Sequence, residues 1–290
     1  MEQYIFLCED SIDGIFTAVY DAWASGYGNK NCKVQIESYE SNYQLFSTYI
    51  TVNTDLEKAE KVGRTIKKKM SVEAYESVCR AAMTSRLDKA DVIYRFIQLG
   101  IYYGPSIITN YSNESVQSIF EMNRTVGNEV HHYLGFLRFF ELKNKVLYAK
   151  INPKNNIVAL LAPHFADRLP CENWIIHDEG RELAAVHQVE HGWVQVRTND
   201  VDFTALGKVD SEEEDMENLW KAFVKSIAIM ERTNLKLQRQ NLPLRFRGNM
   251  TEFIERYKEE NTEDERLNNY SLDGNFVIES ALEDHGVNEK

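Results

Sequence analysis

The sequence predicts an α+β protein, in which helices and strands follow one another along a chain of 290 residues. Strand, helix and strand patterns occupy the first 37 residues, and helical periodicity follows. After Gly135 the apolar residues alternate with a period of two. Periods near 3.6 and 2 indicate helices and strands respectively. We therefore expect an N-terminal strand–helix–strand unit, a helical middle, and an antiparallel β-meander with a long C-terminal helix.

The N-terminal unit begins with Tyr4–Cys8, a run of β-forming residues. The apolar residues of Ile15–Trp23 are spaced as one face of a helix. Ser11 or Asp10 is a suitable N-cap for that helix, because both side chains can accept a hydrogen bond from its first turn. Lys33–Glu37 alternates in polarity, so we predict a second strand there.

The middle of the chain is predicted to be helical. Asp55 can cap the first helix, and two more helices are expected over Val72–Met83 and Lys89–Leu99. A further helix is expected over residues 113–134. Gly135 should end it, since glycine is common just past a helix.

The segment after Gly135 is predicted to be rich in short strands. The expected strands are Phe136–Leu142, Val146–Ile151, Ile157–Ala162, Asn173–His177, Leu183–His187 and Trp193–Arg197. A short helix over His164–Leu169 and one long helix over Glu212–Gln240 complete the segment. We divide the chain into residues 1–53, 54–134, 135–250 and 251–290. The first three should pack as one compact unit, and the last is an acidic tail poor in periodicity.

Composition and charge narrow the classes of function. The first residues lack the basic start of a signal peptide, and the longest apolar run is far shorter than the ~20 residues that span a bilayer. We therefore expect a cytoplasmic protein with no membrane partner. The cysteines are not in metal-ligand or redox spacing, so reduced thiols are expected at Cys8, Cys32, Cys79 and Cys171.

The net charge of −12 is unevenly distributed. Residues 251–290 hold 12 acidic and 4 basic residues, whereas residues 221–250 hold 7 basic residues and a single acidic one. Residues 51–150 are also basic in balance. Because a polyanion responds to the local potential, two basic segments are candidate nucleic-acid contacts. The alternative is that they are solvated helix faces.

Three acids lie at the turn from the first strand to the first helix: Glu9, Asp10 and Asp13. Ligands of open α/β sheets bind at the carboxyl ends of strands, and carboxylates there can hold a divalent cation. The alternative is that Asp10 or Ser11 caps the helix while the other acids lie in water.

Glu129 and His132 are three residues apart and share a helical face, so a hydrogen-bonded pair is expected. Arg138 lies between apolar residues and shares a strand face with Phe136 and Phe140. Such an arginine either has a carboxylate partner or faces an anion from an aromatic platform. Asp167 is the first carboxylate to consider.

The third polar cluster lies in residues 164–178. Asp167 and Arg168 can form an ion pair, and His132 with Asp167 is a possible acid/base pair. His177 and Asp178 are neighbours in a strand and must point to opposite faces. The sequence contains no Walker loop, no G-x-G-x-x-G and no H-E-x-x-H, so we predict no cofactor and no metal.

Several short motifs follow one another along the chain: Asp10–Ala22, Arg124, Glu129, His132, Gly135–Phe139, Ala162–Arg168, Trp174–Asp178 and Leu242–Phe246. In this order, over about residues 1–250, the chain resembles a bacterial family of DNA repair or DNA metabolism proteins. The core of that family carries the domain of unknown function numbered 4130. The resemblance implies a stand-alone partner of a radical-SAM-type protein, whereas related proteins fuse the domain to a uracil-DNA-glycosylase-like domain. It assigns no catalytic residue.

Three hypotheses follow. The first is an accessory protein that binds DNA or another nucleic acid. Its phosphate contacts would be Arg138, Arg168, Arg245, Arg247 and Lys67–Lys69, with Phe136, Phe140 or Trp174 stacking on bases. The second is a metal-dependent hydrolase or nuclease in which Asp10 and Asp13 hold the metal and His132, Asp167 or His177 transfers protons. The third is a non-catalytic scaffold whose acidic tail docks the partner.

Overall fold

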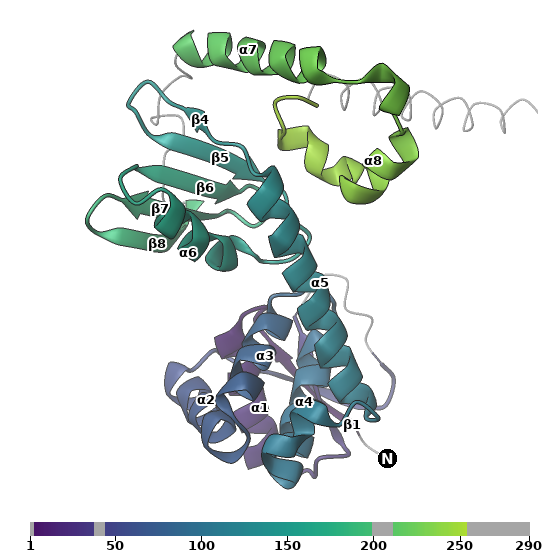
Figure 1. Ribbon diagram of the computed structural model, residues 1–290. Helices are drawn as coiled ribbons and strands as arrows, with labels where there is room; N and C mark the ends of the chain where they lie inside the picture. Colours follow the sequence, from purple (N-terminus) through teal and green to yellow (C-terminus); the bar gives the residue numbers. More distant parts are fainter. Residues whose placement is uncertain (1–2, 38–43, 199–210, 254–290) are drawn as a thin grey trace, which may run out of the picture. The chain divides into compact units, whose positions relative to one another are not determined.

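The computed structural model describes residues 3–37, 44–198 and 211–253. It divides the chain into two compact units. Unit 1 comprises residues 1–134 and 153–164, and unit 2 comprises residues 135–152 and 165–290 (Figure 1). Both units mix helices and strands, so the α+β class is confirmed. No helix in the described part is long and apolar enough to cross a membrane.

Unit 1 consists of a small sheet and a set of helices. Its elements are β1 (Gln3–Cys8), α1 (Ile12–Ala24), β2 (Cys32–Ile36), β3 (Ser47–Thr51), α2 (Leu56–Lys69), α3 (Val72–Ala82), α4 (Lys89–Tyr103), the 3-10 helix η1 (Gly104–Thr109) and α5 (Glu114–Phe136), whose last two residues fall in unit 2. The predicted strand–helix–strand start and the three helices of the middle are confirmed.

The sheet of unit 1 has the order β2-β1-β3, and β1 is parallel to both neighbours. Four consecutive residues of β1, from Ile5 to Cys8, are buried, so both faces of the central strand are covered. The sequence did not predict β3, because its stretch STYIT is short and half exposed and lacks a clear apolar alternation. The parallel order places the carboxyl ends of all three strands at one edge.

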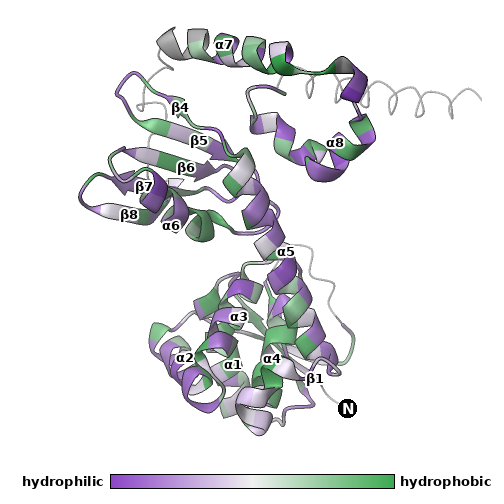
Figure 2. Cartoon of the chain, viewed as in Figure 1, coloured by the Kyte–Doolittle hydropathy of each residue, from purple (hydrophilic) through white to green (hydrophobic). Residues whose placement is uncertain are grey.

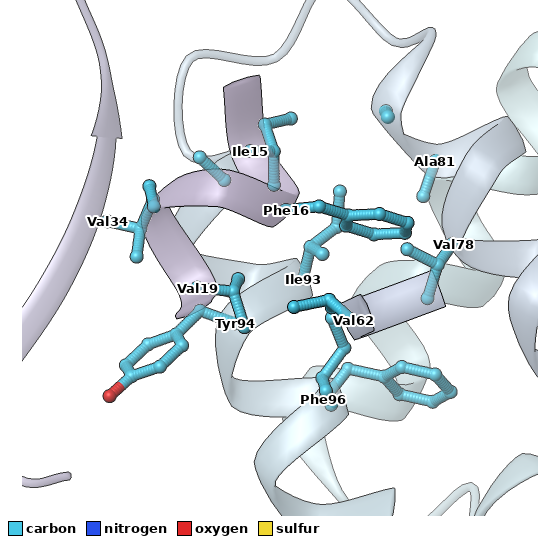
Figure 3. Packing of buried hydrophobic residues seen from close by; sticks show 14 of the residues in the cluster. Ile15, Phe16, Val19, Val34, Val62, Val78, Ala81, Ile93, Tyr94 and Phe96 are labelled. Atoms are coloured by element: carbon cyan, nitrogen blue, oxygen red, sulfur yellow. The ribbon is translucent and has the colours of Figure 1, made fainter. Parts of the chain in front are cut away.

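The core of unit 1 lies between these helices and the sheet. Phe16, Val62, Val78 and Ile93 point toward one another from α1, α2, α3 and α4 (Figure 3). Figure 2 shows the hydrophobic colour concentrated on α1 and α4 in this unit. The helices approach closely where a side chain is missing. A Cβ atom on Gly63 of α2 would lie 3.2 Å from the ring of Tyr75.

Unit 2 contains a five-stranded mixed sheet of order β4-β5-β6-β7-β8. The strands are β4 (Phe140–Glu141), β5 (Leu147–Ile151), β6 (Trp174–Asp178), β7 (Leu183–Gln188) and β8 (Gly192–Arg197). β5 and β6 are parallel, whereas the other neighbours are antiparallel. The antiparallel meander was therefore predicted correctly from β6 to β8 and wrongly between β5 and β6.

The error between β5 and β6 has one cause. Ile157–Ala162 was predicted to be a strand, but the chain forms helix α6 (Val158–Arg168) there. Ile157, Leu161 and Phe165 are buried at intervals of four, which is the spacing of a helical face. A short apolar run does not distinguish a buried strand from a buried helix. A helix between two strands also permits the parallel crossover that a tight turn cannot make.

Two further boundaries differ from the prediction. The strand expected over Phe136–Leu142 is reduced to β4, because α5 continues to Phe136, one residue past Gly135. The single helix expected over Glu212–Gln240 is divided into α7 (Ser211–Ile227), the 3-10 helix η4 (Met230–Arg232) and α8 (Leu235–Asn241). Asn234 starts α8 by accepting a hydrogen bond from Leu237 N at 3.0 Å, which favours a new helix over a continuous one. The expected acidic tail lies mostly outside the described residues.

Candidate functional site

The acids at the carboxyl end of β1 are engaged by neighbouring side chains. Ser11 caps α1 by accepting from Gly14 N at 3.0 Å, which confirms one of the two expected caps. Asp10 Oδ1 lies 2.5 Å from the Nζ atom of Lys89, a buried lysine that also donates to Thr84 O at 2.7 Å. Glu9 accepts from Thr54 Oγ1 at 2.8 Å. Asp10 therefore faces an ammonium group, and the described residues contain no group of three or more metal-ligating side chains.

Glu129 is buried and holds the loop before α6. Its carboxylate accepts from Lys154 N at 3.0 Å, from Asn155 N at 2.8 Å and from Asn155 Nδ2 at 2.7 Å. Asn155 Oδ1 in turn accepts from Ser85 N at 3.0 Å. The carboxylate thus fixes the loop at residues 153–157 to α5 within unit 1. The expected pair between Glu129 and His132 stays a prediction.

Arg138 has a carboxylate partner, but it is not Asp167. Its guanidinium donates to Glu252 Oε1 at 2.9 Å, and Asp167 is exposed near the end of α6. A second nitrogen of Arg138 donates to Gly135 O at 3.0 Å and to Leu137 O at 3.2 Å. The reason lies in the backbone: α5 ends at Phe136, so Arg138 meets carbonyl groups that a helix end leaves without partners. The arginine was expected on a strand face, where those carbonyls would be absent.

Two residues proposed to contact nucleic acid are buried. The Trp174 side chain is fully buried, and its ring stacks on His187 with centroids 5.0 Å apart. Arg247 is also buried: it donates to Leu242 O at 3.2 Å and lies over the ring of Phe253. The proposed roles of Trp174 and Arg247 are therefore corrected to packing. Arg168 and Arg245 are exposed, as a phosphate contact requires.

His177 and Tyr148 form a neutral pair on neighbouring strands. His177 Nδ1 lies 2.5 Å from the Tyr148 hydroxyl oxygen. Burial lowers the pKa of His177 below its usual value, and burial raises the pKa of Tyr148 to about 12. Both shifts favour the uncharged forms. At neutral pH both rings are therefore uncharged, and a single hydrogen atom forms the bond between the Tyr148 hydroxyl oxygen and His177 Nδ1.

Asp178 points away from His177, as the strand alternation predicts. Its fully buried carboxylate lies 3.1 Å from an Arg181 nitrogen in the turn after β6. Burial raises the pKa of Asp178, and the Arg181 guanidinium opposes that shift. On the strand pair β5–β6, Lys150 Nζ meets Glu179 Oε1 at 2.6 Å. These two ion pairs tie the end of β6 to its turn and to β5.

A basic and aromatic surface forms where α2 and α4 end. Lys67, Lys68 and Lys69 make up the last turn of α2 and are exposed. Tyr102 and Tyr103, with exposed fractions of 82% and 51%, make up the last turn of α4. We call these five residues the basic–aromatic edge. Figure 2 shows α2 as mainly hydrophilic.

Two packing contacts bring the ends of these helices together. A Cβ atom on Gly100 of α4 would lie 2.0 Å from Met70 Cε, so Met70 fills the space that the glycine leaves. A Cβ atom on Gly104 would lie 3.8 Å from Lys69 O. Sequence reasoning included the lysines but missed Tyr102 and Tyr103, because the helix predicted over Lys89–Leu99 ends before them, whereas α4 continues to Tyr103.

Comparison with known proteins identifies the family. Residues 87–252, more than half of the chain, match the model of DUF4130, a domain of unknown function. The chain belongs to the DUF4130 family. This match confirms the domain that the sequence motifs indicated. DUF4130 residues therefore include α4, the whole described sheet of unit 2 and the segment from α7 to Glu252.

Comparisons with curated proteins and with solved structures give no further information on function. No curated protein matches the chain. One solved structure, described as the DHH domain of a member of a family of ribosomal proteins, is similar over 65% of this chain and 74% of its own. The sequence identity is 9% and the TM-score is 0.32. A similarity at that level does not establish a common fold.

Proposed function

We propose that this chain binds single-stranded nucleic acid and acts as an accessory protein in DNA repair or DNA metabolism. The supporting observation is the basic–aromatic edge of unit 1, where three lysines and two exposed tyrosines share one surface. Proteins that bind single strands combine cationic side chains with aromatic faces on which unpaired bases stack. Tyr102 is 82% exposed, so a base that stacks on its ring buries apolar surface of both partners.

The local charge supports the same proposal. α2 carries six basic and two acidic residues, although the chain as a whole carries −12. The Nζ atom of Lys67 lies 3.9 Å from the ring centroid of Tyr75 on α3, and this cation–π contact orients the side chain. The negative end of the α2 dipole favours cations at this position. The basic residues are therefore concentrated at the end of α2, beside the end of α4 that carries Tyr102 and Tyr103.

Binding of a fluorescent single strand of about 12 nucleotides tests the proposal. Anisotropy titrations between about 50 and 200 mM salt should show an affinity that falls steeply, because each phosphate contact releases a counterion. The variant Lys67→Gln/Lys68→Gln/Lys69→Gln should bind at least about tenfold more weakly. Its salt slope should decrease by about 2, as the loss of three phosphate contacts predicts.

A matched variant controls for net charge. Lys30→Gln/Lys143→Gln/Lys154→Gln removes the same charge from three exposed lysines outside the edge and should leave binding unchanged. Tyr102→Ala should weaken binding, whereas Tyr102→Phe keeps the ring and should not. Equal losses in the two triple variants, or an affinity independent of salt, would contradict the proposal.

The family resemblance supplies a partner for this accessory role. We propose a radical-SAM-type protein, and the test is co-purification of the two proteins with and without a single strand. A stable complex that survives high salt supports direct association. The absence of any complex under both conditions would remove the partner from the proposal and leave nucleic-acid binding in place.

A further inference from the structure

A second potential ligand site lies in unit 2, far along the sequence from the basic–aromatic edge. The end of α7, η4, α8 and residues 251–253 line an open cavity of about 770 Å³. Pockets that bind small molecules have volumes of roughly 300–1,000 Å³. The cavity is therefore large enough for a ligand of one or two rings with attached polar groups.

The charges around the cavity favour an anion. Lys221, Lys225 and Arg232 line it, and Glu252 is the acidic residue of the lining. Arg138 donates to Glu252 Oε1 at 2.9 Å and offsets that charge. Lys225 and Arg232 form no ion pair with any residue that the structure describes, so their charges remain available to a ligand. Phosphate groups match such a set of cations.

The remaining polar atoms of the lining favour a ligand that also carries N–H donors. Gln238 Oε1 and Glu252 Oε2 are buried, and within the described part of the chain neither has a hydrogen-bond partner. Glu252 is largely enclosed, with 8% of its side chain exposed. A buried acceptor without a donor carries an uncompensated desolvation cost. A ligand that donates to Gln238 Oε1 and Glu252 Oε2 forms two hydrogen bonds and removes that cost at both atoms.

The walls of the cavity are apolar. Val224, Leu235, Leu237, Leu242 and Phe253 contribute this surface. Apolar walls with a few placed polar groups are typical of pockets for ring-containing ligands. A nucleoside phosphate combines a flat apolar ring, N–H donors at the ring edge and a phosphate, which are the three properties that this cavity requires.

We propose that the cavity of unit 2 binds a nucleoside phosphate, either as a free nucleotide or as the terminal nucleotide of a single strand. The phosphate lies against Lys225 and Arg232, and the base edge donates to Gln238 and Glu252. This inference rests on the proposed function, because it names the unit of nucleic acid that the second site takes. The basic–aromatic edge then contacts the strand, and the cavity takes one nucleotide.

Calorimetric titration of the full chain with guanosine monophosphate tests the inference. Guanine presents adjacent N–H donors at one edge. Guanosine monophosphate should bind at least tenfold more tightly than inorganic phosphate and than guanosine, because each of these lacks one half of the ligand. An acidic peptide that binds more tightly than the nucleotide would overturn the inference. So would equal affinities for phosphate and for guanosine monophosphate.

Variants separate the cavity from the surrounding basic surface. Lys225→Gln/Arg232→Gln should weaken nucleotide binding at least tenfold. Lys236→Gln/Arg239→Gln removes the same charge from exposed residues outside the lining and should leave the affinity within twofold of the wild type. In the variant Gln238→Leu, the affinity for guanosine monophosphate should fall close to the affinity for ribose phosphate, because the base loses one of its acceptors. Equal losses in the two double variants would overturn the inference.

A competition experiment shows whether the cavity takes a free nucleotide or a strand end. A comparison of strand binding with nucleotide binding then shows which of the two proposals fails. A 5′-phosphorylated strand that competes with guanosine monophosphate better than the unphosphorylated strand assigns the cavity to a strand end; equal competition assigns it to free nucleotide. The variant Lys67→Gln/Lys68→Gln/Lys69→Gln should lose strand binding and keep nucleotide binding. If the wild type binds the strand but no nucleotide, the cavity inference fails and the proposed function stands. If the nucleotide binds and the strand does not, the proposed function fails.

Discussion

Two basic segments of the molecule lie in different environments. Lys67, Lys68 and Lys69 are all exposed at the end of α2 in unit 1, whereas the two arginines beside Phe246 in unit 2 differ in exposure. Arg245 is exposed, but Arg247 is buried against Leu242 O and the Phe253 ring. Basic and aromatic residues that are neighbours in sequence therefore do not by themselves define a binding surface.

The difference has a physical cause. A guanidinium is planar, weakly hydrated and carries several donors, so it can be buried where backbone carbonyls receive those donors. Arg138 and Arg247 both find such carbonyls beside the ends of helical segments. A lysine ammonium is compact and strongly hydrated, so lysines at a helix end stay in water unless acceptors surround them. Among the described residues Lys89 is a buried lysine at a helix end, because Asp10 Oδ1 and Thr84 O both lie within hydrogen-bond distance of its ammonium group.

The largest expected effect is the difference in free energy of unfolding between substitutions of a buried and of an exposed aromatic residue. Trp174→Ala should lower the free energy of unfolding by about 3–5 kcal/mol, because it removes a fully buried ring that stacks on His187. Tyr102→Ala should change it by less than about 0.5 kcal/mol, as exposed substitutions usually do. Urea denaturation followed by circular dichroism measures both. Similar losses in the two variants would show that Tyr102 is a packing residue and would remove it from the basic–aromatic edge.

The same contrast explains what the sequence could predict. Strong periodicity located the helices of unit 1 and the strands β6, β7 and β8 within a few residues. It failed at Ile157–Ala162, where six apolar residues are too few to distinguish the two periods. For the polar residues, sequence predicted that Arg138 needs a partner but not that Glu252, more than 100 positions away, supplies it. Such a pairing depends on tertiary packing, which no local pattern contains.

A second prediction concerns the buried acid of unit 1. Glu129→Gln should cost about 1–3 kcal/mol, because an amide nitrogen replaces either Oε1, which accepts from Lys154 N, or Oε2, which accepts from Asn155 N and Nδ2. Glu121→Gln is the control, since Glu121 is exposed on the same helix and its contact with Arg86 is 3.9 Å long. The variants are compared by urea denaturation. An unchanged stability in Glu129→Gln would show that the loop at residues 153–157 does not depend on this carboxylate.

A third prediction separates the two arginines beside Phe246. Arg247→Met keeps the apolar length of the side chain but leaves Leu242 O without its donors, so it should cost about 1 kcal/mol of stability. Arg245→Met should leave stability within about 0.5 kcal/mol, because Arg245 is exposed. The affinity for single-stranded nucleic acid should respond in the opposite way. Arg245→Met is expected to weaken it, whereas Arg247→Met is not. If Arg247→Met reduced strand binding without loss of stability, its assignment to packing would be wrong.

The smallest expected effect is a pH dependence centred on His177. Burial lowers the pKa of this histidine in the folded protein, so below its ordinary value of 6.5 the unfolded chain binds more protons than the folded one. The contribution of His177 to stability is therefore complete above pH 6.5 and is lost as the pH falls toward the folded pKa. Urea denaturation at pH 7.5 and 5.5 should show a smaller loss in His177→Asn than in the wild type, because the variant does not titrate in this range. Tyr148→Phe removes the hydroxyl that faces Nδ1 but keeps the ring that buries it, so NMR titration of His177 in this variant should still give a pKa below 6.5. A pKa at or above 6.5 in the wild type would contradict the assignment of His177 and Tyr148 as a buried neutral pair.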